Sequence, residues 1–349
     1  MEIKIGKKVI GDNHPVFIVA EMSANHDGEK QKAIDMIHVA KEIGADAVKL
    51  QTYEASSITL KSEKPDFLLP ADSPWADYNS LWDLYSKGST PYEWHEELFE
   101  VARDIDLEIF STPFDEYGIN FLNKLDVSVF KIASPEINHL PLLKLAAQVS
   151  KPIILSSGVS NFDDLDLAIK YLRSINPDVE IILLKCNSSY PSPIEDSNLR
   201  TIKDMRDTFN VLTGFSDHTE GTTAALAAVA CGATIIEKHF CLPGEESVDS
   251  FFSMQPEEFK KLVEKVRNFE TALGSVSYDI TESAKQSING RRSLYVAKDI
   301  AKGEVITEDN LKCVRPAHSL HPKYYEDILG KHSKKKLKKG DRIELDYFK

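Results

Sequence analysis

Eight short apolar runs, each followed by a longer stretch with helical spacing, dominate the first 240 residues of this chain. The runs are rich in Val, Ile, Leu and Phe and span residues 16–22, 46–52, 108–114, 129–134, 152–158, 181–188, 211–217 and 234–240. Continuous apolar runs of this length indicate strands buried on both faces, as in a parallel sheet. The alternation therefore predicts eight βα units.

Apolar residues recur every three or four positions in the stretches between and after these runs, at residues 29–44, 91–105, 161–175, 198–209 and 256–274. Such spacing is typical of helices that cover a sheet with one face. Eight βα units in about 260 residues fit a TIM barrel better than an open doubly wound sheet. No GxGxxG motif follows the first run, as a dinucleotide-binding sheet would require. We predict an α/β fold, a TIM (β/α)8 barrel over residues 1–282.

Two segments depart from the alternation. Beyond residue 283 short β-like pieces replace it, and this segment of roughly 60 residues is too short to extend the barrel. We predict a separate small, mainly-β module over residues 283–349. The second segment, residues 53–90, is a long connection with several Pro, Trp and Tyr residues. A loop of that length in a compact domain typically serves as a lid or cover.

The composition excludes several classes of function. A net charge of −13 argues against nucleic acid as a partner. No stretch approaches the roughly 18 apolar residues of a membrane span, and residues 1–6 lack the apolar core of a signal peptide. The four cysteines form no CxxC pair and are expected to be reduced. We therefore expect a cytoplasmic protein without a membrane partner, in which local cations hold any anionic substrate.

Polar residues gather at the carboxyl ends of the predicted strands, where a TIM barrel keeps its chemistry. Lys49 and Gln51 share one face of the second strand, and Ser216 and His218 share one face near the end of the seventh. The other polar residues at or just beyond the strand ends include Glu21, Thr112, Lys131, Ser134, Glu136, Ser156, Ser157, Asn187, Ser188, Glu237 and His239. If these faces point inward, the mouth of the barrel is a site for an anion beside a metal.

Two histidines and two lysines carry most of this prediction. Neutral imidazoles at the ends of neighbouring strands, His218 and His239, can hold one divalent metal, although a strand-end histidine is commonly a hydrogen-bonded core residue. Single strand-end Ser and Thr residues commonly cap the following helix. Lys49 and Lys131 are harder to explain structurally, because an unpaired lysine inside a barrel costs several kcal/mol of desolvation. They require an anionic ligand or carboxylate partners.

Several motifs together resemble the sialic acid (nonulosonic acid) synthase family. They are AEMSANHDG at residues 20–28, KLQT at 49–52, STPF at 111–114, KIAS at 131–134, SDH at 216–218 and EKHF at 237–240. The tail motifs RSLY at 292–295, KGE at 302–304 and VRP at 314–316 resemble the antifreeze-like (SAF) module of these enzymes. Within the family, residues 22–26, 90–95 and 320–325 are more similar to the pseudaminic acid synthases than to the N-acetylneuraminate synthases.

The resemblance implies an enzyme, a transferase that condenses phosphoenolpyruvate with a 2-acetamido sugar aldehyde and releases phosphate. For the pseudaminic type the acceptor is 2,4-diacetamido-2,4,6-trideoxy-L-altropyranose and the product is pseudaminic acid. An N-acetylneuraminate or legionaminate synthase, with a different 2-acetamido sugar, is the alternative. By similarity the cofactor is a divalent metal, Mn²⁺ with Mg²⁺ or Co²⁺ as substitutes, which His218 and His239 bind and which acts as a Lewis acid on the aldehyde.

The resemblance also implies residue roles. Glu21 is the expected base or water-orienting carboxylate, and with His218 and His239 it forms the expected catalytic set. The phosphate and carboxylate of phosphoenolpyruvate are expected to contact Lys49, Thr112, Lys131, Ser134, Ser156, Ser188 and Ser216. Ser188 stands where neuraminate synthases typically have an asparagine, so it takes over that phosphate-binding role only in part.

The acceptor sugar is expected to contact Gln51, Glu136 and Asp249. In this family the tail module of one subunit caps the barrel of its partner. The resemblance therefore implies a domain-swapped homodimer, in which Arg315 reaches the acetamido group of the sugar from the second subunit.

Two other functions are compatible with the residues. Lysines at barrel strand ends also act as Schiff-base nucleophiles, so an aldolase that works through Lys131 needs no metal. A non-catalytic sugar-binding or ice-binding protein would have its function in the tail module. That function would leave the two inward lysines and the histidine pair unexplained.

Overall fold

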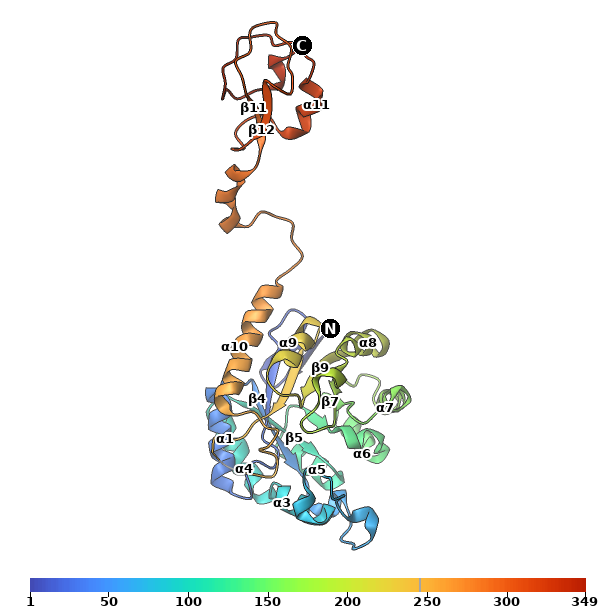
Figure 1. The fold of residues 1–349 in the computed structure, drawn as a ribbon. Helices are drawn as coiled ribbons and strands as arrows, with labels where there is room; N and C mark the ends of the chain where they lie inside the picture. Colours follow the sequence, from blue (N-terminus) through green and yellow to red (C-terminus); the bar gives the residue numbers. More distant parts are fainter. Residues whose placement is uncertain (245) are drawn as a thin grey trace. The chain divides into compact units, whose positions relative to one another are not determined.

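The predicted barrel is present in the computed structural model, which describes residues 1–244 and 246–349 (Figure 1). Its parallel strands are β3 (Phe17–Glu21), β4 (Ala47–Thr52), β5 (Glu108–Pro113), β6 (Phe130–Ile132), β7 (Ile153–Ser156), β8 (Ile181–Cys186), β9 (Leu212–Asp217) and β10 (Ile235–His239). Each pairs with the next, and β10 pairs with β3 to close the barrel. Every predicted run contains one of these strands, so the eight-unit prediction is confirmed.

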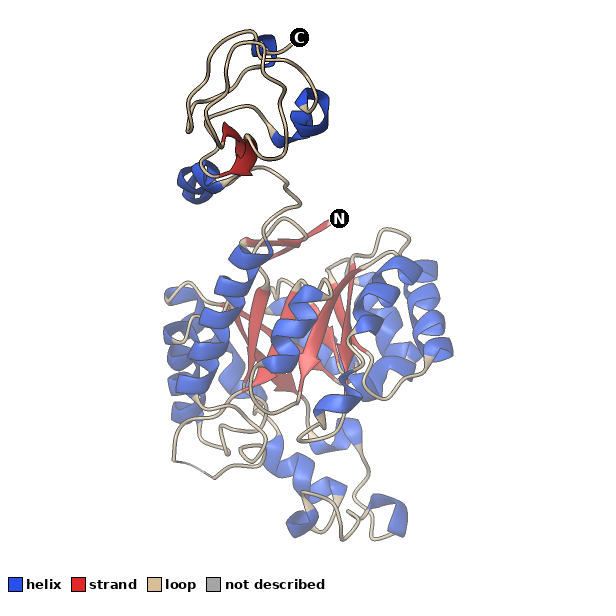
Figure 2. Cartoon of the chain, turned by 45° about the horizontal axis from the view of Figure 1, so that its top comes forward, coloured by secondary structure: helices blue, strands red, loops and turns tan. Residues whose placement is uncertain are grey.

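Helices cover the outside of the barrel (Figure 2). Those that follow β3 to β10 in turn are α1 (Lys30–Glu42), α4 (His95–Asp104), α5 (Glu116–Lys124), α6 (Leu140–Gln148), α7 (Phe162–Ile175), α8 (Arg200–Phe209), α9 (Thr223–Ala230) and α10 (Pro256–Leu273). Their apolar faces pack on the outward side chains of the strands in one large core. Met36 and Ile37 of α1, for example, are fully buried there with Val48 of β4.

The inward side chains of the strands form an apolar lower layer and a polar upper layer. Val19, Ala47 and Leu212 belong to the lower layer, which is an apolar cluster inside the barrel. Because strand side chains alternate with period two, the next inward residue along β3 is Glu21 and along β4 is Lys49. The two-residue alternation along the strands thus places polar side chains inside the barrel at its carboxyl end.

A hairpin outside the predicted elements closes the amino-terminal end of the barrel. It consists of β1 (Glu2–Ile5) and β2 (Lys8–Gly11), which pair antiparallel. Ile3, Ile5 and Ile10 are buried in the same cluster as the lower inward layer. The N-terminus and α3 (Leu81–Gly88) lie at opposite ends of the barrel unit (Figure 1).

The long connection between β4 and α4, residues 53–90, is called the excursion below. It contains two α-helices, α2 (Ala55–Ile58) and α3, and two short 3₁₀ helices, Pro65–Phe67 and Ala76–Tyr78. Trp75 Nε1 donates a hydrogen bond to the carbonyl oxygen of Val248 at 3.1 Å, in the connection between β10 and α10. Lys87 forms an ion pair with Asp27 at 2.8 Å, in the connection after β3. The excursion is therefore anchored to two other loops at the carboxyl ends of the strands.

The chain divides into two compact units, Met1–Gly274 and Ser275–Lys349. The second unit contains the antiparallel pair β11 (Ser293–Val296) and β12 (Leu311–Val314), the short helix α11 (Tyr325–Ile328) and isolated β-bridges. It has its own apolar core, which includes Leu294, Ile300 and Phe348. Among the described residues of both units, no helix combines the length and apolar character needed to cross a membrane.

Candidate active site

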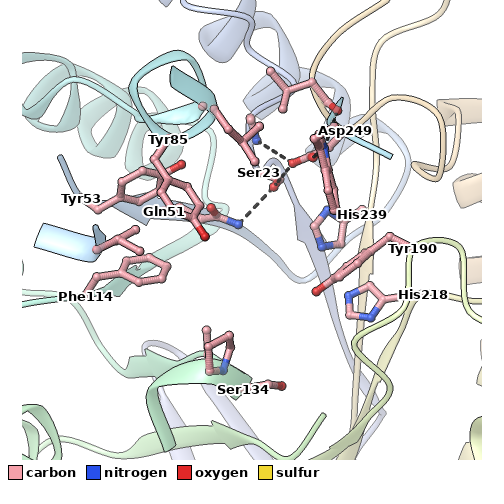
Figure 3. Close-up of a pocket in the computed structure, with 18 of the residues that line it drawn as sticks. Ser23, Gln51, Tyr53, Tyr85, Phe114, Ser134, Tyr190, His218, His239 and Asp249 are labelled. Carbon is pink, nitrogen blue, oxygen red and sulfur yellow. Dashed lines mark hydrogen bonds between the residues drawn. The ribbon is translucent and has the colours of Figure 1, made fainter. Parts of the chain in front are cut away.

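A cavity of about 450 Å³ opens at the carboxyl ends of the barrel strands (Figure 3). Its volume lies within the range of small-molecule sites. Ten residues predicted for the site line it: Lys49, Gln51, Lys131, Ser134, Glu136, Ser156, Ser216, His218, His239 and Asp249. The alternation of the strands thus brings together side chains from five strands, β4, β6, β7, β9 and β10, and their following loops.

The two buried lysines have carboxylate partners. Lys49 Nζ lies 2.9 Å from Glu21 Oε2 and 3.4 Å from Glu237 Oε1. Lys131 Nζ lies 3.9 Å from the same Glu237 oxygen, and Ser216 Oγ donates to that oxygen at 3.0 Å. All four charged side chains are at most 5% exposed. Two positive and two negative charges therefore form one buried network whose formal charges cancel.

Burial and neighbouring charges separate the two carboxylates. Burial raises the pKa of Glu21, although Lys49 opposes the rise. Burial would also raise the pKa of Glu237, but Lys131 and Lys49 outweigh it and lower this pKa. Burial lowers the pKa of Lys131 in turn. Glu237 is thus held ionised between two cations, whereas Glu21 is the carboxylate suited to take up a proton.

Hydroxyl groups surround Lys131 and the loop after β7. Lys131 Nζ donates to Ser156 Oγ at 2.7 Å, and the backbone N–H of Gly158 donates to Ser134 Oγ at 2.9 Å. A Cβ at residue 158 would lie 2.2 Å from Ser188 Oγ, so only glycine fits here. Ser188 Oγ is buried without a hydrogen-bond partner among the described residues.

The helix-cap interpretation of the strand-end hydroxyls does not hold. The side chains that cap α5 and α7 are those of Asp115 and Asn161. Thr112 instead accepts a hydrogen bond from Lys49 Nζ at 3.4 Å, and Ser156 accepts one from Lys131. Their hydroxyl groups point at the buried lysines and not at helix termini.

The two histidines lie side by side on the side of the cavity opposite Tyr53 and Phe114 (Figure 3), with ring centroids 5.2 Å apart. His218 Nδ1 lies 2.7 Å from the carbonyl oxygen of Asn187, a contact that makes Nδ1 the donor and leaves Nε2 as the free nitrogen. His239 Nδ1 is buried without a partner among the described residues, and burial lowers the pKa of this imidazole well below its usual range. A neutral imidazole is the form that binds a metal.

This geometry fits a shared ion. The rings are close enough for one ion to lie between them, and His218 has its Nε2 free for such an ion. In the described part of the chain, no third His, Cys, Asp or Glu joins the pair as a metal-binding cluster. The pair could therefore supply two ligands of one ion.

Cys186 lies beside this pair and was not among the predicted site residues. Its Sγ is 3.9 Å from His218 Nδ1. Burial alone would raise the pKa of the thiol, but contact with His218 outweighs it and lowers the pKa to about 7. Burial would lower the pKa of His218, whereas Cys186 and Asn187 raise it.

A polar chain links Asp249 to the lysine network. Ser23 Oγ donates to Asp249 Oδ2 at 2.5 Å, and Gln51 Nε2 donates both to Ser23 Oγ at 3.1 Å and to Glu21 Oε1 at 3.0 Å. Trp75 Nε1 contacts the other Asp249 oxygen at 3.2 Å. Burial raises the pKa of Asp249, and Ser23 opposes the rise. These hydrogen bonds place the polar groups of Ser23, Gln51 and Asp249 together at one rim of the cavity.

The rest of the lining is largely apolar. The residues that sequence reasoning did not assign to the site include Ser23, Tyr53, Trp75, Leu84, Tyr85, Phe114, Cys186, Tyr190 and Phe252. Glu237, which was expected at the barrel mouth without a specific role, also lines the cavity. The Tyr190 ring lies 4.4 Å from that of His218 and 4.9 Å from that of Phe252. Tyr53, Trp75 and Tyr85 belong to the excursion, and its high aromatic content was the sequence feature that could have indicated them.

Four predicted residues, Glu21, Thr112, Ser188 and Arg315, do not line the cavity directly. Glu21 and Thr112 contact Lys49, which does, and Ser188 lies behind Gly158. Arg315 belongs to the second compact unit, where it lines a surface hollow together with Arg291 and Arg292.

Comparisons with known proteins identify the family of this chain. The model of the NeuB family matches residues 36–278, and the model of the SAF domain matches residues 291–346. Pseudaminic acid synthase from Campylobacter jejuni strain 81-176 is 44% identical, over 96% of this chain and 97% of the relative. Pseudaminic acid synthase from Helicobacter pylori is 45% identical, over 95% and 97%. Legionaminic acid and neuraminate-9-phosphate synthases match at lower identity.

A solved structure supports the same assignment. The N-acetylneuraminic acid synthetase of Leptospira borgpetersenii superposes with a TM-score of 0.72 at 30% identity, over 82% of this chain and 95% of that one. Sequence, fold and the lysine-lined barrel mouth agree: the chain belongs to the NeuB family.

Proposed function

We propose that this chain is a pseudaminic acid synthase, which condenses phosphoenolpyruvate with 2,4-diacetamido-2,4,6-trideoxy-L-altropyranose to give pseudaminic acid and phosphate. The observation that carries the proposal is one cavity in which two buried lysines and two paired imidazoles face an apolar side. The identity of 44–45% to pseudaminic acid synthases along almost the whole chain supports this choice of acceptor.

Phosphoenolpyruvate would bind deepest, against Lys49 and Lys131. The hydroxyls of Ser134, Ser156 and Ser216 line the same part of the cavity and are suited to donate to its phosphate and carboxylate oxygens. We assign Thr112 and Ser188 supporting roles, since Thr112 contacts Lys49 and Ser188 lies behind Gly158.

In the proposed reaction, C3 of phosphoenolpyruvate forms a bond to the aldehyde carbon of the open-chain sugar, whose oxygen takes up a proton and becomes a hydroxyl. Water then adds at C2 and gives up a proton, for which Glu21 is the proposed base. The bond between C2 and the phosphate oxygen breaks, phosphate leaves and C2 becomes a ketone. Gln51, Glu136 and Asp249 are the proposed ligands of the acceptor, because all three line the cavity.

We propose His218 and His239 as the metal ligands, with Mn²⁺ as the ion and Mg²⁺ or Co²⁺ as substitutes. When bound, the ion would act as a Lewis acid that polarises the aldehyde. The Asn187 carbonyl that orients His218 supports this assignment, because metal-binding histidines commonly donate their second nitrogen to such a group.

The C-terminal unit is proposed to cap the barrel of a second copy in a domain-swapped homodimer, with Arg315 near the acceptor. Charge supports the pairing: residues 275–349 carry 16 basic and 11 acidic residues, whereas residues 1–274 carry 26 and 44. Chains with Arg315→Ala and with Glu21→Ala, each inactive alone, should regain activity when they are co-assembled. Failure to regain activity would overturn the swapped arrangement. The use of phosphoenolpyruvate supports a cytoplasmic location.

The test of the function is an acceptor panel in a phosphate-release assay with Mn²⁺. The panel compares N-acetylmannosamine, a 2,4-diacetamido sugar derived from bacillosamine and the 2,4-diacetamido altrose sugar. We expect the highest kcat/KM with the altrose sugar. A preference for N-acetylmannosamine would refute the pseudaminic assignment, and no phosphate release with any sugar would refute the reaction class.

One observation favours a second candidate, a Schiff-base aldolase. Burial lowers the pKa of Lys131, as a nucleophilic amine requires. Borohydride trapping of pyruvate on Lys131, together with full activity after chelation of metals, would favour it over the synthase.

A further inference from the structure

The apolar side of the cavity is built mainly by the excursion. Its side chains Tyr53, Ile58, Leu81, Leu84 and Tyr85, with Phe114 from the end of β5, are called the apolar wall below. Tyr53 packs edge to face against Phe114, with centroids 5.0 Å apart, and against Tyr85 at 6.1 Å. Tyr53 is 5% exposed, so the wall is backed by packed protein.

The wall faces the polar half of the same cavity. Tyr53, Tyr85 and Phe114 lie together on one side, and Tyr190, His218 and His239 lie on the other (Figure 3). Nothing in the proposed roles of the lysines, hydroxyls or histidines uses the wall. A ligand that spans the cavity must therefore present apolar groups on the side away from the lysines.

One carboxylate lines the cavity beside the wall without a partner. Glu136, in the turn Ser134–Asn138 after β6, has its Oε2 buried with no hydrogen-bond partner among the described residues. Burial raises its pKa to about 7. Glu136 lines the same cavity as Tyr53 and Tyr85 of the wall. A buried acceptor without a donor, next to aromatic rings, complements a group that has both an N–H and a methyl.

We propose that the apolar wall is the specificity site for the substituents that distinguish the acceptor from common hexosamines. A methyl of an N-acetyl group and the C6 methyl of a 6-deoxy sugar lie against the wall, and the amide N–H of that acetyl group donates to Glu136. N-acetylmannosamine carries hydroxyls at C4 and C6, which find no partner on the wall. An apolar pocket rejects a ligand that adds a hydroxyl by about 100-fold. This inference rests on the proposed function for the identity of the sugar.

Two substitutions test the wall in the full-length protein. Ile58→Thr and Leu84→Gln add polar atoms to two half-buried wall residues, and each changes the side chain by one heavy atom. Leu60→Gln is the matched control, since Leu60 lies on the same excursion, is 64% exposed and is not part of the cavity lining. The measurements are kcat/KM for the altrose sugar and for N-acetylmannosamine at saturating phosphoenolpyruvate, and the KM of phosphoenolpyruvate.

For each wall variant we expect a fall of about 10-fold or more in the ratio of the two kcat/KM values. The KM of phosphoenolpyruvate should stay within twofold, and Leu60→Gln should change none of the three. An unchanged ratio in both wall variants would overturn the inference while leaving the synthase function intact. An equal loss with both sugars would overturn it too, because it would indicate general damage to the site.

A binding measurement separates the inference from the reaction. Saturation-transfer NMR with the altrose sugar and metal-free protein saturated with phosphoenolpyruvate reports which sugar protons touch the protein, without turnover. The acetyl and C6 methyl protons should receive more saturation than the ring protons, and Leu84→Gln should reduce this excess. Stronger transfer to ring protons, or no transfer at all, would refute the wall. Strong methyl transfer in a protein that releases no phosphate would keep the wall and refute the proposed function.

Discussion

Removal of Lys238 should destabilise the barrel far more than removal of an equally well-paired surface lysine. Lys238 Nζ lies 2.9 Å from Asp217 Oδ2, and the two side chains are 4% and 0% exposed. Asp217 also accepts hydrogen bonds from the backbone and hydroxyl of Thr219 at 2.9 and 2.7 Å. Lys238→Met leaves this carboxylate buried without its cation. The loss of one partner of a buried pair costs about 3–5 kcal/mol of unfolding free energy.

The assay is urea unfolding followed by tryptophan fluorescence. The three tryptophans, at positions 75, 82 and 94, all belong to the barrel unit, so the signal reports on that unit alone. The matched control is Lys170→Met, because Lys170 pairs with Asp166 at 2.7 Å but is 74% exposed. We expect the control to cost about 0.5 kcal/mol or less. A loss below about 1 kcal/mol in Lys238→Met, or one equal to the control, would refute the reasoning from burial.

Three further outcomes follow from the site. Burial raises the pKa of Glu136 to about 7, so between pH 5 and 7 this carboxyl group is protonated in the folded state and ionised in the unfolded state. The free energy of unfolding should therefore fall as pH rises from 5 to 8. In paired urea titrations the Glu136→Gln variant should lack the contribution of this group to the pH dependence. Lys131→Met should raise the KM of phosphoenolpyruvate by at least about 10-fold in the phosphate-release assay, since it removes a charge-assisted contact; the Lys170→Met control should leave it unchanged, and an equal KM in both variants would contradict the role of Lys131. His239→Ala should weaken Mn²⁺ binding by more than about 100-fold in an EPR titration, because loss of a group that only orients a metal-binding histidine already costs up to about 100-fold. Unchanged binding would remove this residue from the metal site.

The barrel could be predicted because its signal is local and repeated. Each strand is a short apolar run, and the two-residue period then fixes which side chains face inward, as for Lys49 with Gln51 and Glu237 with His239. The two buried lysines were predicted to have either an anionic ligand or carboxylate partners. The structure shows carboxylate partners, because Glu237 lies between Lys49 and Lys131. The choice between a ligand and carboxylate partners depended on distances that no sequence pattern contains.

The parts that escaped prediction depend on contacts between distant segments. The β1–β2 hairpin has strands of four residues, in which only two positions per strand are buried, too few for a clear period. Trp75 reaches the site through a hydrogen bond to Val248, 173 positions away along the chain. An irregular excursion has no period that would indicate which of its side chains face a ligand.

The β1–β2 hairpin should also determine the order in which the two substrates bind. With Ile3, Ile5 and Ile10 packed into the lower end of the barrel, the interior is a blind-ended cup that fills only through its upper mouth. The substrate that contacts Lys49 and Lys131 must enter before the one that contacts the loops above them. Initial-velocity and product-inhibition patterns should accordingly be those of an ordered sequential mechanism, with phosphoenolpyruvate first and the sugar second.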